Sequence, residues 1–269
     1  MSTVSYRHFT GRAAENYQRD FVPLIATPVA ETLLRAADLR HGERVLDVAC
    51  GTGHVTRAAA AAVGDTGTVT GVDIAPDMIE VAKSVAVPRG ARIDWQIGDA
   101  AALPIPDASV DVVLCQMGLM FITDGTAAVA EMRRVLRPSG RVAINTPGRI
   151  PPFFEALEGA LVSCIGPDLG GFVSVVFSMH DPDGVTALLS AAGLRDASSS
   201  VVTTRLRLPE PAEFLWRYIG LTPMAAFIEQ APETARSALE SVFVEEAQPH
   251  VVDGTSVVDL PVVVATARG

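Results

Sequence analysis

Short apolar runs and longer helical patterns alternate along residues 41–146. Val45, Leu46, Val48 and Ala49 form a nearly continuous apolar run, which is typical of a parallel strand covered on both faces. Similar runs predict further strands at 67–73, 91–97, 110–115 and 141–145. Helical spacing predicts helices between them at 55–63, 76–86 and 126–136. This alternation of strands and helices predicts a parallel sheet with right-handed crossovers.

The pattern changes on both sides of this segment. Helical spacing at 10–16 and 23–37 predicts two helices before the first strand, where they could cap a site. After a break rich in proline and glycine at 147–152, an aromatic-rich stretch follows. The remainder predicts helices at 182–192, 210–228 and 232–247 and strands at 201–208 and 257–267.

A glycine turn follows the first predicted strand, within the stretch from Arg44 to Thr56. Gly51 and Gly53 allow the backbone to turn tightly and to approach a ligand where a Cβ would collide. The next predicted helix points its N-terminal N–H groups back at this turn. We therefore expect a small ligand with anionic and hydroxyl groups at this position.

Two common nucleotide-binding motifs fit this turn poorly. A nicotinamide dinucleotide turn has a third glycine where Thr56 stands, and a P-loop has a lysine that this turn lacks. Asp47 lies inside the preceding strand, where it would repel a pyrophosphate. Thr56 and Asp47 thus argue against an NAD(P)-dependent oxidoreductase, which Asp73 alone would permit. A cofactor that carries an amino group would instead make Asp47 useful.

Charge and composition narrow the range of partners. The 269-residue chain has a net charge of −10 and a pI near 4.9, which argue against nucleic acid and against an acidic membrane surface. Its three cysteines, at 50, 115 and 164, include no C-x-x-C pair, so they indicate neither a disulfide framework nor a zinc ribbon. The sequence shows neither an apolar leader nor a run of about 18 apolar residues. We expect a soluble, cytoplasmic protein that does not insert into a membrane.

The motifs together resemble the class I methyltransferases that use S-adenosylmethionine. Val-Leu-Asp-Val-Ala-Cys-Gly-Thr-Gly at 45–53 is similar to the first motif of that family, and Gly-Val-Asp at 71–73 is similar to the second. Residues 98–100, 111–116 and 131–141 resemble the later motifs. The resemblance is to the subgroup that contains ubiquinone and menaquinone C-methyltransferases and many natural-product methyltransferases. Ser139, where a second glycine is usual, and Met120 depart from the family pattern.

The resemblance implies an α/β fold with a Rossmann-like, mostly parallel sheet of seven strands. Helices would cover both faces, the last strand would be antiparallel, and helical segments would form a cap or lid. It also implies a single methyltransferase domain over residues 1–269. Within it, residues 1–40 would form N-terminal cap helices and residues 41–146 the cofactor-binding core. Residues 147–250 would form a C-terminal half with lid-like helical insertions, and residues 251–269 the final strand.

The resemblance further implies roles for individual residues in cofactor binding. Asp47 would face the ammonium group of the methionine portion, which the N–H groups of Gly51 to Gly53 would surround. Asp73 would accept both ribose hydroxyls, because one carboxylate can accept several hydrogen bonds. Asp99 would accept the adenine amino group. The other residues implied at the cofactor are Tyr17, Ala49, Thr52, Ile74, Met78, Ala100, Cys115 and Gln116.

Candidates for substrate binding and proton transfer rest on residue type. Phe9, Met120, Phe121, Phe172, Phe177 and Tyr218 could line an apolar substrate pocket, and ordinary core packing is the alternative for each of them. His8 and His180 could act as general bases because imidazole titrates near neutral pH. Surface or packing roles compete with that interpretation, so the sequence assigns no catalytic residue.

The function implied by the resemblance is transfer of a methyl group from S-adenosylmethionine to an O, N or C atom of a small molecule. The aromatic residues of the later segments favour an aromatic or apolar substrate. The sequence signals neither a metal nor a nucleic-acid partner, and it leaves a homodimer open. One alternative is a methyltransferase-like protein that binds the cofactor without catalysis, because the motif residues report cofactor binding and not turnover.

Overall fold

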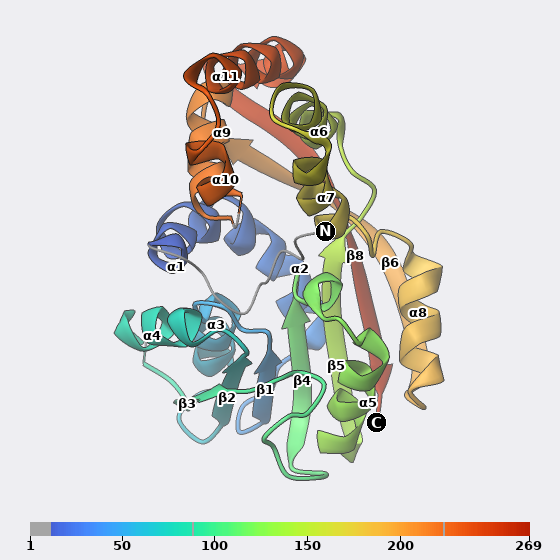
Figure 1. The fold of residues 1–269 in the computed structure, drawn as a ribbon. Coiled ribbons are helices and arrows are strands. Elements are labelled where there is room, and N and C mark those ends of the chain that lie inside the picture. Colours follow the sequence, from blue (N-terminus) through green and yellow to red (C-terminus); the bar gives the residue numbers. More distant parts are fainter. Residues whose placement is uncertain (1–11, 88, 223) are drawn as a thin grey trace.

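A mixed sheet forms the centre of the fold. The computed structural model describes residues 12–87, 89–222 and 224–269, and its strands follow the order β3-β2-β1-β4-β5-β8-β6 (Figure 1). Strands β1 to β5 pair in parallel, and β8 pairs antiparallel with both β5 and β6. The predicted fold class, with its antiparallel last strand, is confirmed. The strands are β1 (Arg44–Val48), β2 (Thr68–Asp73), β3 (Arg92–Ile97), β4 (Val110–Gln116), β5 (Leu136–Pro147), β6 (Arg195–Leu208), the short β7 (Val251–Val252) and β8 (Thr255–Arg268).

Helices cover both faces of the parallel strands because successive side chains of each strand point to opposite faces. In β1, Val45 packs against helices α2 (Thr27–Ala37) and α3 (His54–Val63). Its neighbour Leu46 packs in the opposite layer with α5 (Gly125–Val135) and α8 (Pro182–Ala191). Helix α4 (Pro76–Ser84) follows β2 and contacts both β2 and β3. The parallel strands are therefore buried between two apolar layers.

A separate helical layer covers the distal halves of β6 and β8, at the top of Figure 1. It is built around Phe153, whose ring contacts the rings of Phe214 and Phe243 edge-on. Its helices are α6 (Pro152–Cys164), α7 (Pro167–Val176), α9 (Pro211–Gly220), α10 (Ala225–Glu229) and α11 (Glu233–Ala247), with a single turn at Gln248–His250. Another single turn, Leu119–Phe121, follows β4 and contacts α7. None of the helices within the described residues is long and apolar enough to cross a membrane.

The N-terminal helical region differs from the sequence prediction. Instead of two helices, the chain continues through α1 (Ala13–Asn16), a π-helical segment (Tyr17–Ala26) and α2 without a break. Pro23 lies inside the π-helical segment, although the sequence predicts that it begins a new helix. The wider turn of a π-helix changes the hydrogen-bond partners around the proline, so the missing N–H does not end the helix. This segment lies beside the ends of β1 and β4 and covers the site described next.

Candidate functional site

Two residues in the left-handed backbone region follow the parallel strands β1 and β4. Ala49 comes directly after β1 with φ +55°, and Met117 comes directly after β4 with φ +47°. Residues other than glycine rarely adopt this conformation, and such strain is found most often at functional sites. Both residues line the same cavity, so the carboxyl ends of the two strands form one wall of it.

Asp73 ends β2 and joins that strand to the glycine turn. Its Oδ2 accepts the Gly51 N–H at 2.7 Å, and its Oδ1 accepts the Ala75 N–H at 2.9 Å. Burial raises the pKa of Asp73, and these backbone donors oppose that rise. Each carboxylate oxygen keeps a further lone pair for a ligand donor. Asp73 also lines the cavity, which places a half-buried acceptor at its edge.

Asp47 lies deeper in the same edge of the sheet and is 1% exposed. Its Oδ2 accepts the Thr56 hydroxyl at 2.6 Å. Burial raises the pKa of Asp47 to about 7, against the effects of the Thr56 hydrogen bond and of the Arg57 charge. A buried carboxyl group with such a pKa is a favourable acceptor for a positively charged ligand group.

The glycine turn is closed by its own hydrogen bonds. The Gly51 N–H is donated to Asp73, and the Gly53 N–H is donated to the Cys50 carbonyl at 2.9 Å. These two N–H groups are therefore not available to a ligand in this conformation. The sequence predicts instead that the N–H groups of the turn surround the methionine portion of the cofactor. Gly53 has φ +80°, and a Cβ there would lie 2.1 Å from Cη2 of Trp95. Gly53 is thus required by packing behind the turn.

Two adjoining cavities lie at this edge of the sheet. The larger, of about 190 Å³, is bounded by the residues after β1 and β4, by the π-helical segment and by the separate helical layer. The smaller, of about 30 Å³, is bounded by Asp47, Thr52 and His54. Tyr17, Ala49 and Gln116 line both, so the two cavities adjoin. A single ligand could therefore place a polar group in the small cavity and extend into the large one.

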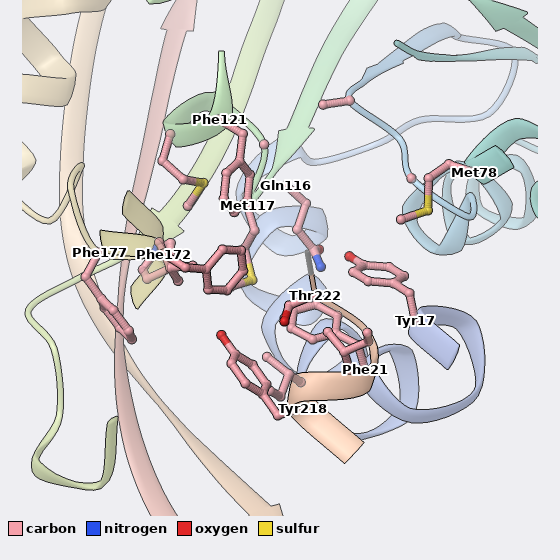
Figure 2. Close-up of a pocket in the computed structure, with 18 of the residues that line it drawn as sticks. Tyr17, Phe21, Met78, Gln116, Met117, Phe121, Phe172, Phe177, Tyr218 and Thr222 are labelled. Atoms are coloured by element: carbon pink, nitrogen blue, oxygen red, sulfur yellow. The ribbon is translucent and has the colours of Figure 1, made fainter. Parts of the chain in front are cut away.

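The larger cavity has a mixed end and an aromatic end, as Figure 2 shows. Tyr17 and Met78 lie at one side of the view, Phe172 and Phe177 lie at the other, and Gln116 lies between them. The ring of Phe172 stacks on Phe121 at 6.4 Å and meets Tyr218 edge-on at 6.4 Å. This end of the cavity therefore suits a flat apolar group, since aromatic rings favour stacked and edge-on contacts.

Two buried acceptors at the smaller cavity have no hydrogen-bond partner among the described residues. These are Thr52 Oγ1 and Gln116 Oε1. The orientation of the Gln116 amide is set by its Nε2, which donates to the Ala26 carbonyl at 3.0 Å. Buried acceptors without donors cost free energy, so a ligand that brings several N–H or O–H groups would satisfy them. S-adenosylmethionine, with an ammonium group and two ribose hydroxyls, has that set of donors.

Tyr17 covers the glycine turn from the π-helical segment. A Cβ on Gly51 would lie 3.7 Å from the Tyr17 ring, and that ring stacks on Phe21 with centroids 4.6 Å apart. Burial and the neighbouring Asp73 raise the pKa of Tyr17, so its hydroxyl remains a donor at neutral pH. Tyr17 and Phe21 thus separate the turn from solvent.

Most predicted site residues line the two cavities. From the predicted cofactor set these are Tyr17, Asp47, Ala49, Gly51, Thr52, Asp73, Ile74, Met78 and Gln116. From the predicted substrate set they are Met120, Phe121, Phe172, Phe177 and Tyr218. Their roles stay predictions, since lining a cavity does not identify its ligand.

Other predicted residues lie elsewhere. Cys115 points into the apolar layer with α5, where burial raises its pKa to about 12, and Ala100 lies in the same layer. Asp99 accepts the Ala101 N–H, and neither Asp99 nor Gly53 is among the residues that line these two cavities. His180 is exposed, and its Nδ1 lies 3.0 Å from the Phe177 carbonyl oxygen. His8 and Phe9 lie outside the described residues.

Several residues that line the two cavities are not predicted from the sequence. Phe21 and Ile25 are carried by the π-helical segment, and Met117 by the left-handed turn after β4. Gly118 follows that turn, and Val22, Ala26, Cys50, His54 and Val55 line the smaller cavity. The others, in the larger cavity, come from the segment after residue 121. They are Ile122, Pro147, Phe154, Val176, Leu221, Thr222 and Leu260. The aromatic spacing of Tyr17 and Phe21, four residues apart on a helix, is one signal that could have identified the covering face.

Comparisons with known proteins bear on this geometry. A family model described as a methyltransferase domain matches residues 45–140. The chain is 32% identical over 254 residues to the nocamycin O-methyltransferase of Saccharothrix syringae, and the match covers 90% of each chain. It is 43% identical over 108 residues to the ubiquinone/menaquinone biosynthesis C-methyltransferase UbiE of Burkholderia mallei (strain SAVP1). That match covers 40% of this chain and 44% of the relative.

One solved structure shares the fold over nearly the whole chain. It is the phosphoethanolamine N-methyltransferase 2 of Haemonchus contortus in complex with S-adenosyl-L-methionine. The TM-score is 0.57 at 19% sequence identity, and the match covers 95% of this chain and 56% of that chain. At this identity the likeness shows a shared fold.

Proposed function

Because the chain belongs to the class I S-adenosylmethionine-dependent methyltransferases, we propose that it methylates an O, N or C atom of a small aromatic or apolar acceptor. The observation that carries this proposal is the position of the aromatic cavity. Gly51 and Asp73 line this cavity, and it shares Tyr17, Ala49 and Gln116 with the small polar cavity.

The cofactor-binding residues divide according to their chemistry. Asp73 accepts the ribose hydroxyls with the lone pairs that Gly51 and Ala75 leave open. Asp47, with Thr52 and Gln116, accepts the donors of the amino group in the small cavity. Ile74 and Met78 provide apolar contacts for the adenine. When bound, S-adenosylmethionine supplies a methyl group on a positively charged sulfur.

The acceptor-binding residues act by alignment and by exclusion of water. The rings of Phe121, Phe172 and Tyr218 hold a flat acceptor in one orientation. Correct alignment of two reactants is worth effective molarities of about 10⁵ M or more, so positioning alone supplies a large part of the rate. Tyr17 and Phe21 close the cavity towards solvent.

A radiolabelled methyl-transfer assay tests this proposal. The purified protein is incubated with methyl-labelled S-adenosylmethionine and a panel of planar phenols, enols and quinols, with aliphatic amines of similar mass as the control set. The proposal predicts labelled products from planar acceptors. Transfer confined to aliphatic amines would contradict the proposed acceptor class. Tight binding of S-adenosylhomocysteine with no product from any acceptor would support a protein that binds the cofactor without catalysis.

A further inference from the structure

A buried arginine lies directly behind the glycine turn. Arg57 belongs to α3 and is 8% exposed. Its Nη2 donates to the Thr52 carbonyl at 2.8 Å, and its Nη1 lies 3.4 Å from the Ala82 carbonyl oxygen in α4. A guanidinium in the interior that donates to backbone carbonyls fixes the positions of those carbonyls, since its donors lie in one rigid plane.

Trp95 of β3 fills the space beside this guanidinium. The Arg57 guanidinium carbon lies 6.0 Å from the centroid of the Trp95 ring, within the range of a cation–π interaction. A Cβ on Gly53 would lie 2.1 Å from the ring, and a Cβ on Gly71 would lie 2.8 Å from it. One indole therefore occupies the space that two glycines leave open, one in the turn and one in β2.

These contacts connect the two parts of the proposed cofactor site. Thr52 belongs to the turn and lines the small cavity, whereas Gly71 precedes Asp73 by two residues on β2. Arg57 holds the turn and α4, and Trp95 packs against the turn and β2. The pair thus sets the distance between the acceptors of the small cavity and the Asp73 carboxylate.

We propose that Arg57 and Trp95 are positioning residues that align the glycine turn with Asp73 for cofactor binding. Neither residue lines the cavities, so both act through Thr52, Gly53 and Gly71. The inference rests on the proposed location of the cofactor at this turn. It extends that proposal to two residues that do not contact the cofactor themselves.

Arg57 has a second effect, through its charge. The guanidinium lowers the pKa of Asp47, against the larger effect of burial, and so favours the ionised form that attracts an ammonium group. The other titratable groups that act on Asp47 or line its cavity are Asp73 from β2, Tyr17 from the π-helical segment, Cys50 from the turn, Cys115 from β4 and His54 from α3. Removal of the Arg57 charge alone should therefore move the pH at which Asp47 ionises upward.

Calorimetric titration of the full chain with S-adenosylhomocysteine, over pH 5.5 to 8, tests the proposal. In Arg57→Met the Kd should rise about 10- to 100-fold, because a charge-assisted contact to the turn is lost. The pH at which affinity reaches half its maximum should also shift upward. Arg57→Lys keeps the charge but loses the planar donors, so it should bind weakly with the wild-type pH midpoint.

Trp95→Phe should weaken binding while leaving the pH midpoint unchanged. The matched control is Arg92→Met, which removes an exposed arginine from β3, the strand that carries Trp95. It should leave the Kd and the pH midpoint unchanged. Thermal unfolding of each variant separates positioning from stability. A Kd for Arg57→Met within about twofold of wild type, with a lowered Tm, would overturn the inference.

The same titration distinguishes failure of this inference from failure of the proposed site. If the wild-type chain does not bind S-adenosylhomocysteine, the proposed cofactor site is itself wrong. If the wild-type chain and the variants bind S-adenosylhomocysteine equally well, only the positioning role of Arg57 and Trp95 is wrong. If Arg57→Met does not fold, Arg57→Lys and Trp95→Phe still decide the question, since both retain a large side chain in the buried space.

Discussion

Asp47→Asn should make the protein more stable at neutral pH and less able to bind its cofactor. Burial raises the pKa of Asp47 from its ordinary value of 3.8 to about 7. The folded state therefore keeps its proton where the unfolded state has already lost it. Stability contributed by the protonated form is present below about pH 4 and is lost as the pH rises towards 7.

The size of this effect follows from the two pKa values. A difference between 3.8 and about 7 corresponds to roughly 4 kcal/mol of stability, because each unit is worth about 1.4 kcal/mol. Since Asp47 is 1% exposed, solvent does little to reduce that figure. An asparagine carbonyl in Asp47→Asn can still accept the Thr56 hydroxyl, so the main change is the loss of the buried charge.

Urea unfolding at pH 5 and pH 8 measures the effect. Asp47→Asn should exceed the wild type in free energy of unfolding by up to roughly 4 kcal/mol at pH 8, and the difference should narrow to roughly 2 kcal/mol at pH 5. The Kd for S-adenosylhomocysteine should rise at the same time, because the acceptor for the amino group has lost its charge. A variant that is less stable than wild type at pH 8, or a stability difference that does not depend on pH, would show that Asp47 does not carry a buried, destabilising charge.

Three further predictions use related assays. Asp73→Ala should raise the Kd for S-adenosylhomocysteine by an amount equivalent to roughly 1.5–3 kcal/mol, and an unchanged Kd would exclude its proposed role at the ribose. Gly53→Ala should lower the free energy of unfolding by at least about 2 kcal/mol, because its φ is +80° and its Cβ would meet Trp95. The control is Gly159→Ala, which lies in α6 with open space around the added Cβ and should raise the free energy of unfolding by about 0.5–1 kcal/mol. Equal effects of the two substitutions in urea unfolding would contradict the close contact between Gly53 and Trp95. Phe121→Ala should raise the KM for a planar acceptor by about tenfold with the Kd for S-adenosylhomocysteine unchanged, and the opposite pattern would place Phe121 at the cofactor.

The parallel half of the fold was predictable because its signals are local. Strands covered on both faces consist largely of apolar residues, as in β1 and β4. Asp47 interrupts the apolar run of β1, a glycine turn follows that strand, and β2 ends at Asp73. Asp47, Gly51 and Asp73 could be identified in this way. The structure brings all three to one edge, where they line the two adjoining cavities.

The C-terminal half was harder to predict because its helices lack a clear polar face. Helices α6 and α7 are apolar over much of their circumference, so their sequences show little of the 3.6-residue period that identifies an amphipathic helix. The single helix predicted at 210–228 is instead two helices, α9 and α10. Long-range packing between these helices and β8 determines which aromatic side chains reach the cavity.

The left-handed turn after β4 explains why Met117 was not predicted at the cavity. Glycine usually marks such a backbone, but Ala49 and Met117 adopt it here without that signal. Met117 is held by its N–H, which the carbonyl of Asn145 accepts at 2.9 Å. Tertiary contacts therefore impose this conformation, and a reading of local sequence could not place Met117 in the cavity.

A crystal structure of the complex with S-adenosylhomocysteine would test the central claim most directly. That claim is that the edge formed by β1 and β2 holds the cofactor with its sulfur at the mouth of the aromatic cavity. We expect the ribose to lie on Asp73, the amino group in the small cavity with Asp47, and the sulfur beside Ala49 and Gln116. A ligand bound elsewhere, or a sulfur that faces away from the aromatic cavity, would contradict the claim.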